Sequence, residues 1–152
     1  MRIGIISDTH GLLRPEAVRT LQGVQLILHA GDVGSPDILI QLKAMAPVFA
    51  VRGNVDTQPW ARELPETYVV EAGEASFYVL HNLRKLEVKP EMPKFDFVVS
   101  GHTHQAEQIK RNGVIYLNPG GAGRRRFHLP VTLALLDLRR RPWRAEIRQL
   151  VE

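Results

Sequence analysis

Residues that can bind metal recur along this chain, each time directly after a short apolar run. The runs IGIIS, LILHAG, VFAVRG, FYVL and FVVSG are all followed by Asp, His or Asn. A single such residue after a strand is usually a cap or a satisfied polar group, but five coincident placements predict one shared site. The candidate ligands are Asp8, His10, Asp32, Asn54, His81, His102 and His104.

The types of these side chains narrow the choice of metal. Calcium and magnesium favour all-oxygen sites, whereas four imidazoles with two carboxylates and a carboxamide suit Mn, Fe, Zn, Co or Ni. The chain has no Cys, so thiolate ligands are excluded. Seven ligands are too many for one such ion, and we predict two divalent ions that share a carboxylate. His29 and Asp56 are predicted to support the cluster through hydrogen bonds rather than to bind metal.

The first third of the chain alternates strands and helices. Apolar runs predict strands at 2–7, 24–31 and 47–53, and Pro15 and Pro36 are well placed to begin the two helices between them. Strands joined in this way pair in parallel. In open α/β sheets the ligand crevice lies beyond the carboxyl ends of the strands, so side chains far apart in the sequence can converge there.

The rest of the chain favours strands joined by turns. Two strands are predicted around Gly73, one over 95–101, then a hairpin with an Asn-Gly turn and a final pair over 131–150, mostly antiparallel. So many strands exceed one layer, and we predict a single α/β domain over 1–152 in which two packed mixed β-sheets are flanked by helices. Residues 82–95 have the least clear pattern and are expected to form a mobile loop.

Local geometry is expected to aim the ligands at one crevice. In an extended chain, residues i and i+2 project to the same side, so Asp8 with His10, and His102 with His104, would face the crevice together. Glycines are expected where the backbone turns sharply and passes close to the cluster. These are Gly31, Gly53 and Gly101, each directly before a ligand.

The positive charge of the chain is confined to its C-terminal part. The net charge is +4, but residues 124–148 hold eight Arg against Asp137 and Glu146, a local charge of +6. The alternation in WRAEIRQL favours a solvated sheet face, with a nucleic-acid surface as the alternative. No stretch resembles a signal peptide or an apolar span of about 18 residues, so we expect a cytoplasmic protein that does not cross a membrane.

Six motifs along residues 8–120 resemble those of the calcineurin-like metallophosphoesterases, specifically their small prokaryotic phosphodiesterase branch: DTH, GD, GNVD, LH, GHTH and NPG. The resemblance implies a four-layer α/β/β/α sandwich with a dinuclear metal centre. Its pattern divides the ligands into Asp8, His10 and His104 on one ion, Asn54, His81 and His102 on the other, and Asp32 as the bridge. It also implies an in-line attack on phosphorus by a hydroxide that bridges the ions. Catalytic roles then fall to Asp32, Asn54, His81 and His10.

Three departures from the family pattern affect the substrate side. Family members commonly carry His or Cys at the third position of GNxD, and a His there can protonate the leaving oxygen, whereas this chain has Val55. Asn82 and Leu83 follow His81 in place of the usual Gly and nearby His. Gly121 replaces the usual Ser after NPG, although the loop still offers groups that could hold a phosphate, against the alternative of a plain turn with solvated arginines. The candidate substrate contacts are Gly120, Gly121 and Arg124.

Three functions follow from these observations. The leading one is a metal-dependent phosphodiesterase that acts on a small phosphodiester with a good leaving group. The missing proton donor favours a second, a catalytically weak or inactive binding module, for which a retromer scaffold subunit of the same fold is the precedent. The third is a nucleic-acid processing phosphoesterase that uses the C-terminal arginines. The resemblance is also compatible with a homo-oligomer, because family members are often dimers or tetramers.

Overall fold

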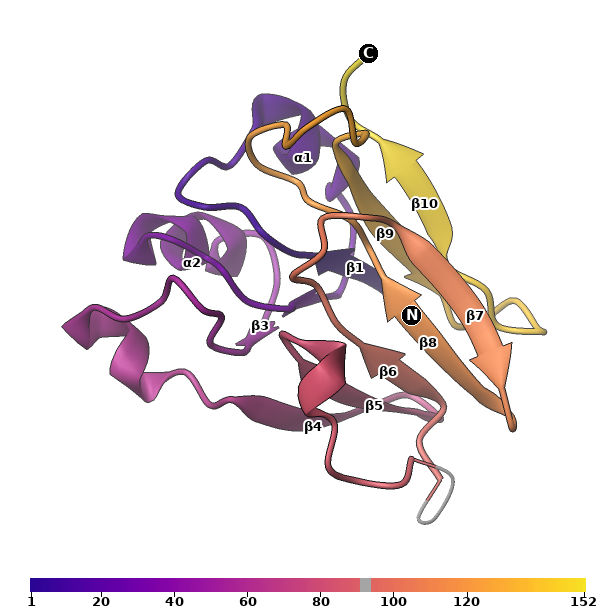
Figure 1. The fold of residues 1–152 in the computed structure, drawn as a ribbon. Helices are drawn as coiled ribbons and strands as arrows, with labels where there is room; N and C mark the ends of the chain where they lie inside the picture. The colour runs from indigo at the N-terminus through magenta and orange to yellow at the C-terminus, as the bar shows by residue number, and fades with distance from the viewer. Residues whose placement is uncertain (91–93) are drawn as a thin grey trace.

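The computed structural model describes residues 1–90 and 94–152, whose strands form two five-stranded sheets (Figure 1). The first sheet contains β1 (Arg2–Ile6), β2 (Leu26–His29), β3 (Val48–Ala50), β9 (Thr132–Asp137) and β10 (Glu146–Gln149). The second contains β4 (Thr67–Ala72), β5 (Ala75–Leu80), β6 (Phe97–Val99), β7 (Glu107–Arg111) and β8 (Val114–Asn118). The strand orders are β10-β9-β1-β2-β3 and β4-β5-β6-β8-β7.

In the first sheet, β1, β2 and β3 run parallel, as the alternation of strands and helices predicts. The helices α1 (Pro15–Thr20) and α2 (Pro36–Lys43) connect them and pack on the same outer face (Figure 1). Ser35 caps α2, because its hydroxyl accepts a hydrogen bond from the Asp37 backbone N–H at 3.2 Å. Within the described ranges, no helix is long and apolar enough to cross a bilayer.

The second sheet, which η1 (Pro59–Glu63) precedes, mixes both strand directions. The antiparallel pairing predicted for this part of the chain holds at the two edges, between β4 and β5 and between β7 and β8. In the middle of the sheet, β5, β6 and β8 run parallel. The segment between β5 and β6 returns the chain to the end of the sheet where β5 began, and strand β7 does the same before β8. As a result, β5 and β6 end side by side.

The two sheets pack face to face around a shared core. Ile3 and Ile5 of the first sheet and Phe77 and Phe97 of the second are fully buried in it, and the two phenylalanine rings lie 4.9 Å apart. Burying each such side chain contributes roughly 1.5–3 kcal/mol. Ile6 points the other way and packs in the cluster that includes α1 and α2. The predicted α/β fold of two packed mixed sheets is confirmed, and the flanking α-helices α1 and α2 cover the outer face of the first sheet.

The outer face of the second sheet is covered in a different way. Buried apolar side chains of β5 and β6 lie there against Leu86 and Phe95, from the segment between these strands. That segment contains the single 3-10 turn η2 (Leu83–Lys85), and no α-helix of the described part of the chain covers this face. The loop predicted over 82–95 includes residues 91–93, which lie outside the described residues, and its mobility stays a prediction.

Candidate metal centre

The predicted ligands stand where five strands end. Asp8 and His10 follow β1, Asp32 follows β2, Asn54 follows β3, His81 follows β5, and His102 and His104 follow β6. The carboxyl ends of parallel strands meet at one edge, so residues distant in sequence come together. Ligand atoms of Asp8, His10 and His104 lie within 4.8 Å of one another, as do those of Asp8, Asp32 and His81.

A cavity of about 540 Å³ adjoins these two groups. Its lining includes the other two predicted ligands, Asn54 and His102, together with members of both groups. The rings of His81 and His102 lie edge to face with their centroids 5.2 Å apart. The structure therefore brings all seven predicted ligands to one place. Asp8 belongs to both ligand groups, whereas the family pattern makes Asp32 the bridge, so the division of ligands between two ions stays a prediction.

Asp8 divides its carboxylate oxygens between the protein and the cluster. Oδ2 accepts hydrogen bonds from the Ser7 hydroxyl at 2.7 Å and from the His102 backbone N–H at 3.0 Å. Oδ1 is buried, has no hydrogen-bond donor among the described residues, and lies 3.4 Å from Nε2 of His104. A buried carboxylate oxygen is costly in this state, and a bound cation would satisfy it.

His81 divides its ring nitrogens in the same way. Nδ1 donates a hydrogen bond to the Ala30 carbonyl at 2.7 Å, and since a carbonyl can only accept, the lone pair of the neutral ring is on Nε2. Nε2 is buried, makes no hydrogen bond within the described ranges, and lies 3.1 Å from Oδ2 of Asp32. A divalent ion suits both an imidazole lone pair and a carboxylate oxygen. The residues present therefore fit divalent metal ions.

The two carboxylates are held in the ionised form. Burial raises the pKa of Asp32, but the approach of His81 and a hydrogen bond from the Val55 backbone N–H outweigh it and lower the pKa to about 2. Burial also raises the pKa of Asp8, and the contact with His10 helps to outweigh it, so the net shift is downward. Both side chains are negatively charged at neutral pH, which is the form that binds metal.

The pKa values of the histidine ligands shift in opposite directions. Asp8 is the main cause of the raised pKa of His10, whereas burial lowers the pKa of His104. Burial also lowers the pKa of His81, but the nearby carboxylates of Asp32 and Asp8 outweigh it, and the net shift is upward. A metal ion must displace protons from His10 and His81 when they are protonated, so metal binding is expected to release protons.

Most of the predicted ligands have a left-handed backbone conformation. The φ angles are 55° at Asp8, 45° at His10, 54° at Asp32, 74° at His102 and 62° at His104. Residues with a Cβ reach this region at a cost of roughly 1–2 kcal/mol each, so the surrounding structure must impose it. The expectation that the i, i+2 pairs project together from an extended chain is wrong, because β1 and β6 end before them. The pairs converge through tight left-handed turns instead.

Glycines let the ligand loops pass close to one another. A Cβ on Gly53 would collide with Asp32, and a Cβ on Gly101 would collide with Asp8. A Cβ on Gly31 would press on the ring of His81, although less closely than at the other two glycines. The predicted close approach of the backbone at these three positions is confirmed, and any larger residue there would push a ligand out of place.

His29 and Asp56 support the ligand loops through hydrogen bonds, as predicted. Burial lowers the pKa of His29 to about 4, so its ring is neutral. Its Nδ1 accepts a hydrogen bond from the Gly31 backbone N–H at 3.1 Å, and Nε2, which then carries the proton, lies 3.1 Å from the Thr9 hydroxyl. Asp56 joins the loop after β2 to the loop after β3. It accepts hydrogen bonds from the backbone N–H groups of Val33, Gly34 and Gly53.

The loop between β8 and β9 brings arginines to the cavity. Arg124 lines it, as does Arg126, whose Nη1 lies 3.5 Å from Nε2 of His104. The backbone N–H of Gly120 donates a hydrogen bond to Oδ1 of Asn118, and the backbone N–H of Gly121 donates one to the His104 carbonyl. Because both N–H groups already have acceptors, the contact of these two glycines with phosphate stays a prediction. The sequence predicts arginine side chains of this loop as phosphate contacts and singles out Arg124, whereas all three consecutive arginines line the cavity.

With this geometry in place, the chain can be compared with known proteins. The sequence profile of the calcineurin-like phosphoesterase superfamily domain matches residues 1–141. The chain belongs to this superfamily. This calcineurin-like phosphoesterase is 38% identical over 132 residues to a protein of Methanothermobacter thermautotrophicus named Probable metallophosphoesterase. The match covers 79% of this chain and 76% of the relative.

Two solved structures share the fold of this chain. That of an archaeal phosphodiesterase is 25% identical, with a TM-score of 0.80 over 97% of this chain and 100% of the other. Vps29 from Chaetomium thermophilum is 16% identical, with a TM-score of 0.79 over 98% of this chain and 95% of the other, and it shows the fold alone. Calcineurin-like phosphoesterases use divalent metals, and the two ligand groups are the candidate metal-binding residues here.

Proposed function

We propose that this chain is a phosphodiesterase that depends on two divalent metal ions. The observation that carries the proposal is the pair of buried, unsatisfied ligand atoms, Asp8 Oδ1 and His81 Nε2, at the place where seven metal-binding side chains meet. Likeness to an archaeal phosphodiesterase supports a phosphodiester as the substrate. We propose Mn as the metal, with Ni, Fe, Co and Zn as alternatives, because a mixed set of nitrogen and oxygen ligands suits divalent transition metals.

The chain's own residues hold and orient the reacting groups. The ligand sets would be Asp8, His10 and His104 for one ion and Asn54, His81 and His102 for the other, with Asp32 between them. Bound divalent ions supply a Lewis acid for the phosphoryl oxygens and lower the pKa of the water that attacks phosphorus. The Ala30 carbonyl fixes the ring of His81, and the Val55 backbone N–H fixes Oδ1 of Asp32 so that Oδ2 faces the cluster.

The arginines at the cavity mouth would bind the substrate's negative charge. Arg124 and Arg126 both line the cavity that adjoins the ligands. A guanidinium can donate two parallel hydrogen bonds to phosphate oxygens, which fixes the orientation of the phosphoryl group. Gly120 and Gly121 would shape this loop, and Gly121 keeps space beside the ring of His104, because a Cβ there would press on it.

No proton donor stands at position 55. Val55 lines the cavity, is 49% exposed and presents only hydrocarbon, so it cannot protonate a leaving oxygen. The leaving oxygen must therefore depart as a stable anion or take its proton from water. The proposed substrates are phosphodiesters with good leaving groups.

Hydrolysis of bis(4-nitrophenyl) phosphate tests the proposal. Activity should require Mn, Co, Ni, Fe or Zn and should fall by at least about 100-fold in Asp32→Ala, because a direct ligand matters at least as much as a supporting hydrogen bond. Asp37→Ala is the matched control, since this exposed aspartate contacts Gln41 on the surface of α2. The control should keep full activity. Absence of hydrolysis with every one of these metals would refute the proposal.

One observation, the missing proton donor at Val55, favours a binding module instead. The complete set of seven ligands argues against it, because a module without chemistry has no need of them. Elemental analysis separates the two functions: about two ions per chain together with hydrolysis supports the enzyme. Metal-free protein without hydrolysis under any metal supports the module.

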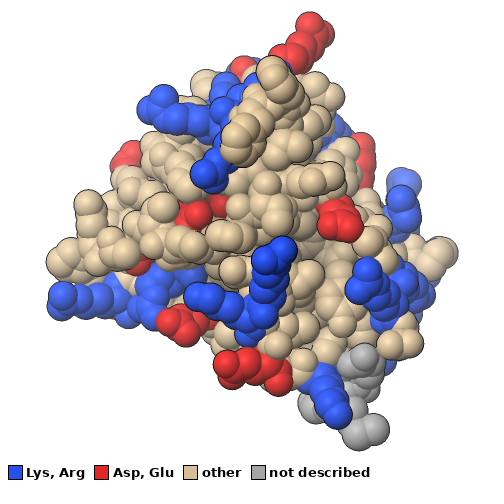
Figure 2. Space-filling view, viewed as in Figure 1, with Lys and Arg blue, Asp and Glu red and all other residues tan. Residues whose placement is uncertain are grey.

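A nucleic-acid substrate has less support. On the face shown in Figure 2, Lys and Arg side chains are interspersed with acidic and neutral ones and form no continuous stripe. Two of the C-terminal arginines, Arg139 and Arg148, pair with Asp137 and Glu146. Binding to single-stranded DNA that is negligible at low salt would remove this alternative. The cytoplasmic location, the single domain and a homo-oligomer stay predictions.

A further inference from the structure

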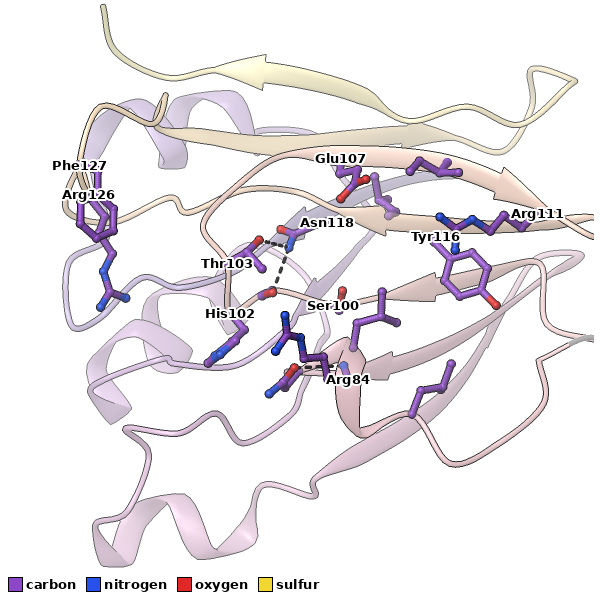
Figure 3. A pocket seen from close by; sticks show the side chains of 16 residues that line it. Arg84, Ser100, His102, Thr103, Glu107, Arg111, Tyr116, Asn118, Arg126 and Phe127 are labelled. Atoms are coloured by element: carbon purple, nitrogen blue, oxygen red, sulfur yellow. Dashed lines mark hydrogen bonds between the residues drawn. The ribbon is translucent and has the colours of Figure 1, made fainter.

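A second, larger cavity of about 820 Å³ lies next to the metal centre. His102 and Arg126 line both cavities, so the two cavities adjoin at these side chains. Figure 3 shows His102 and Arg126 at one end of the larger cavity and Tyr116 and Arg111 at the other. A group attached to a phosphoryl group at the metal centre would therefore extend into it.

The floor of this cavity is the outer face of the second sheet at β7 and β8. Ile109 pairs directly with Tyr116, and Glu107 pairs with Asn118, one step nearer the loop that carries the ligands His102 and His104. The two-residue period places Glu107, Ile109 and Arg111 on one face of β7. No α-helix of the described chain covers this face, and the side chain of Ile109 is 36% exposed.

The walls add apolar groups that are open to solvent. Leu83 of η2, which is 41% exposed, stands on one side with Leu86, and Phe127, which is 80% exposed, stands near the metal centre. The guanidinium of Arg126 lies 5.8 Å from the centroid of the Phe127 ring. Apolar side chains gathered in a cavity, rather than scattered singly over the surface, mark a place where a ligand or partner binds.

The charges and polar groups of the cavity limit what this ligand is. Arg84, Arg111 and Arg126 line it against the single carboxylate of Glu107, so the cavity attracts an anion. A flexible hydrocarbon chain would need a continuous apolar lining, which the arginines and Glu107 interrupt. A planar polar ring suits the apolar and aromatic floor, because bases stack on tyrosine and guanidinium planes. A carboxylate in the middle suits sugar hydroxyls.

We infer that this cavity, here called the nucleoside groove, binds the nucleoside of a nucleotide phosphodiester whose phosphoryl group lies at the metal centre. The base lies over Tyr116 and Ile109, the sugar hydroxyls face Glu107, and Arg126 contacts the phosphate between the two cavities. The inference rests on the proposed function and adds the substrate class to it.

Substrates that share one leaving group test the inference. Thymidine 5′-(4-nitrophenyl) phosphate, methyl 4-nitrophenyl phosphate and octyl 4-nitrophenyl phosphate differ only in the group that the groove would hold. The thymidine ester should have a kcat/KM at least about tenfold above that of the methyl ester, which is the effect expected from stacking one base. Equal values for the thymidine and methyl esters, or a preference for the octyl ester, would overturn the nucleoside groove while leaving the phosphodiesterase intact.

Two matched variants locate the effect. Ile109→Glu places a carboxylate in the groove on edge strand β7, and Val69→Glu makes the same change on the opposite edge strand, β4, where Val69 is 53% exposed. Ile109→Glu should reduce the thymidine-to-methyl ratio of kcat/KM to about one, and Val69→Glu should keep the wild-type ratio. The same ratio in both variants would contradict the assignment. Thermal unfolding of both variants confirms that they are folded.

A binding measurement makes the groove testable without hydrolysis. Thymidine 5′-monophosphate should bind the metal-free protein measurably more tightly than 2-deoxyribose 5-phosphate, which lacks only the base, by calorimetry, and Ile109→Glu should abolish the difference. If no ester is hydrolysed, the proposed function fails, and this comparison still decides the groove. Equal binding of the two phosphates by the wild-type protein would refute it.

Discussion

The metal centre and the nucleoside groove share His102 and Arg126, but they are built from different parts of the fold. The metal centre consists of loops that follow five strands, with buried carboxylates, strained backbone and glycines in close contact. The groove consists of side chains on strand faces, a 3-10 turn and loops, and half of its lining residues are exposed. The surrounding residues fix the conformation of the metal centre through many close contacts, whereas the groove is an open surface beside it.

This difference assigns separate tasks to the two regions. Asp8 of the metal centre is fixed by hydrogen bonds from Ser7 and from the His102 backbone, so its geometry is set before a metal or substrate arrives. Hydrogen bonds also hold the side chains of Asp32 and His81. The groove side chains have room to differ without disturbing the core. Changes in the metal centre should therefore abolish catalysis for every substrate, whereas changes in the groove should alter only which substrate is preferred.

Asp8→Asn is expected to have the largest effect and to separate the two regions most clearly. The amide oxygen can still accept the hydrogen bonds from Ser7 and the His102 backbone, but its NH2 group then faces the cluster in place of Oδ1. Metal content and hydrolysis should both fall by at least about 100-fold, measured by elemental analysis and nitrophenol release. Binding of thymidine 5′-monophosphate to the metal-free variant should match that of metal-free wild type. Full metal content in this variant would show that Asp8 is no ligand.

Val55→His tests the metal centre at a residue that lines its cavity, lies outside the groove lining and is not among the predicted metal ligands. An imidazole there could protonate the leaving oxygen, so hydrolysis of diphenyl phosphate, which has a poorer leaving group, should rise by about tenfold or more. Hydrolysis of bis(4-nitrophenyl) phosphate should change little, since nitrophenolate departs without a proton. Val55→Asn is the control of similar size, with no proton to give near neutral pH. Equal gains for both substrates would mean that the leaving group does not limit the reaction.

The two regions also differ in how much of them could be predicted from the sequence. The metal centre was predictable because five apolar runs are each followed directly by Asp, His or Asn, and because parallel strands end together. The left-handed turns at Asp8 and His102 were not, since the strands end earlier than the apolar runs suggest. The division of ligands between ions came from the family resemblance, and no distance in the structure decides it.

The groove was out of reach of sequence patterns for a physical reason. Its floor depends on the register between β7 and β8, and its walls come from η2 and from the loop after β8. Ile109, Tyr116 and Leu83 are residue types that occur throughout proteins, so they give no signal in the sequence. They line one cavity only because the tertiary structure brings them together. The parallel centre of the second sheet was missed for the same reason, because strand order is not encoded in any one strand.

Asp56→Asn is expected to have the smallest effect on chemistry and tests whether the rigidity of the metal centre depends on residues that bind no metal. Asp56 is buried, and its two carboxylate oxygens accept hydrogen bonds from three backbone N–H groups. The amide of an asparagine has only one oxygen, so its NH2 group would face the remaining N–H donors. The change should cost about 1–3 kcal/mol in the free energy of unfolding and lower metal affinity by about tenfold.

Asp96→Asn is the control for this change, because Asp96 accepts hydrogen bonds from the Ser76 backbone and hydroxyl in the second sheet. It should lower the unfolding temperature without changing metal affinity. Calorimetric titration of Mn into both variants makes the comparison. If both variants lose the same affinity, general destabilisation explains the loss. If only Asp56→Asn loses metal affinity, the loops after β2 and β3 must be held together for the ligands to converge. Asp56 does not line the groove, so the substrate preference should be unchanged in both variants.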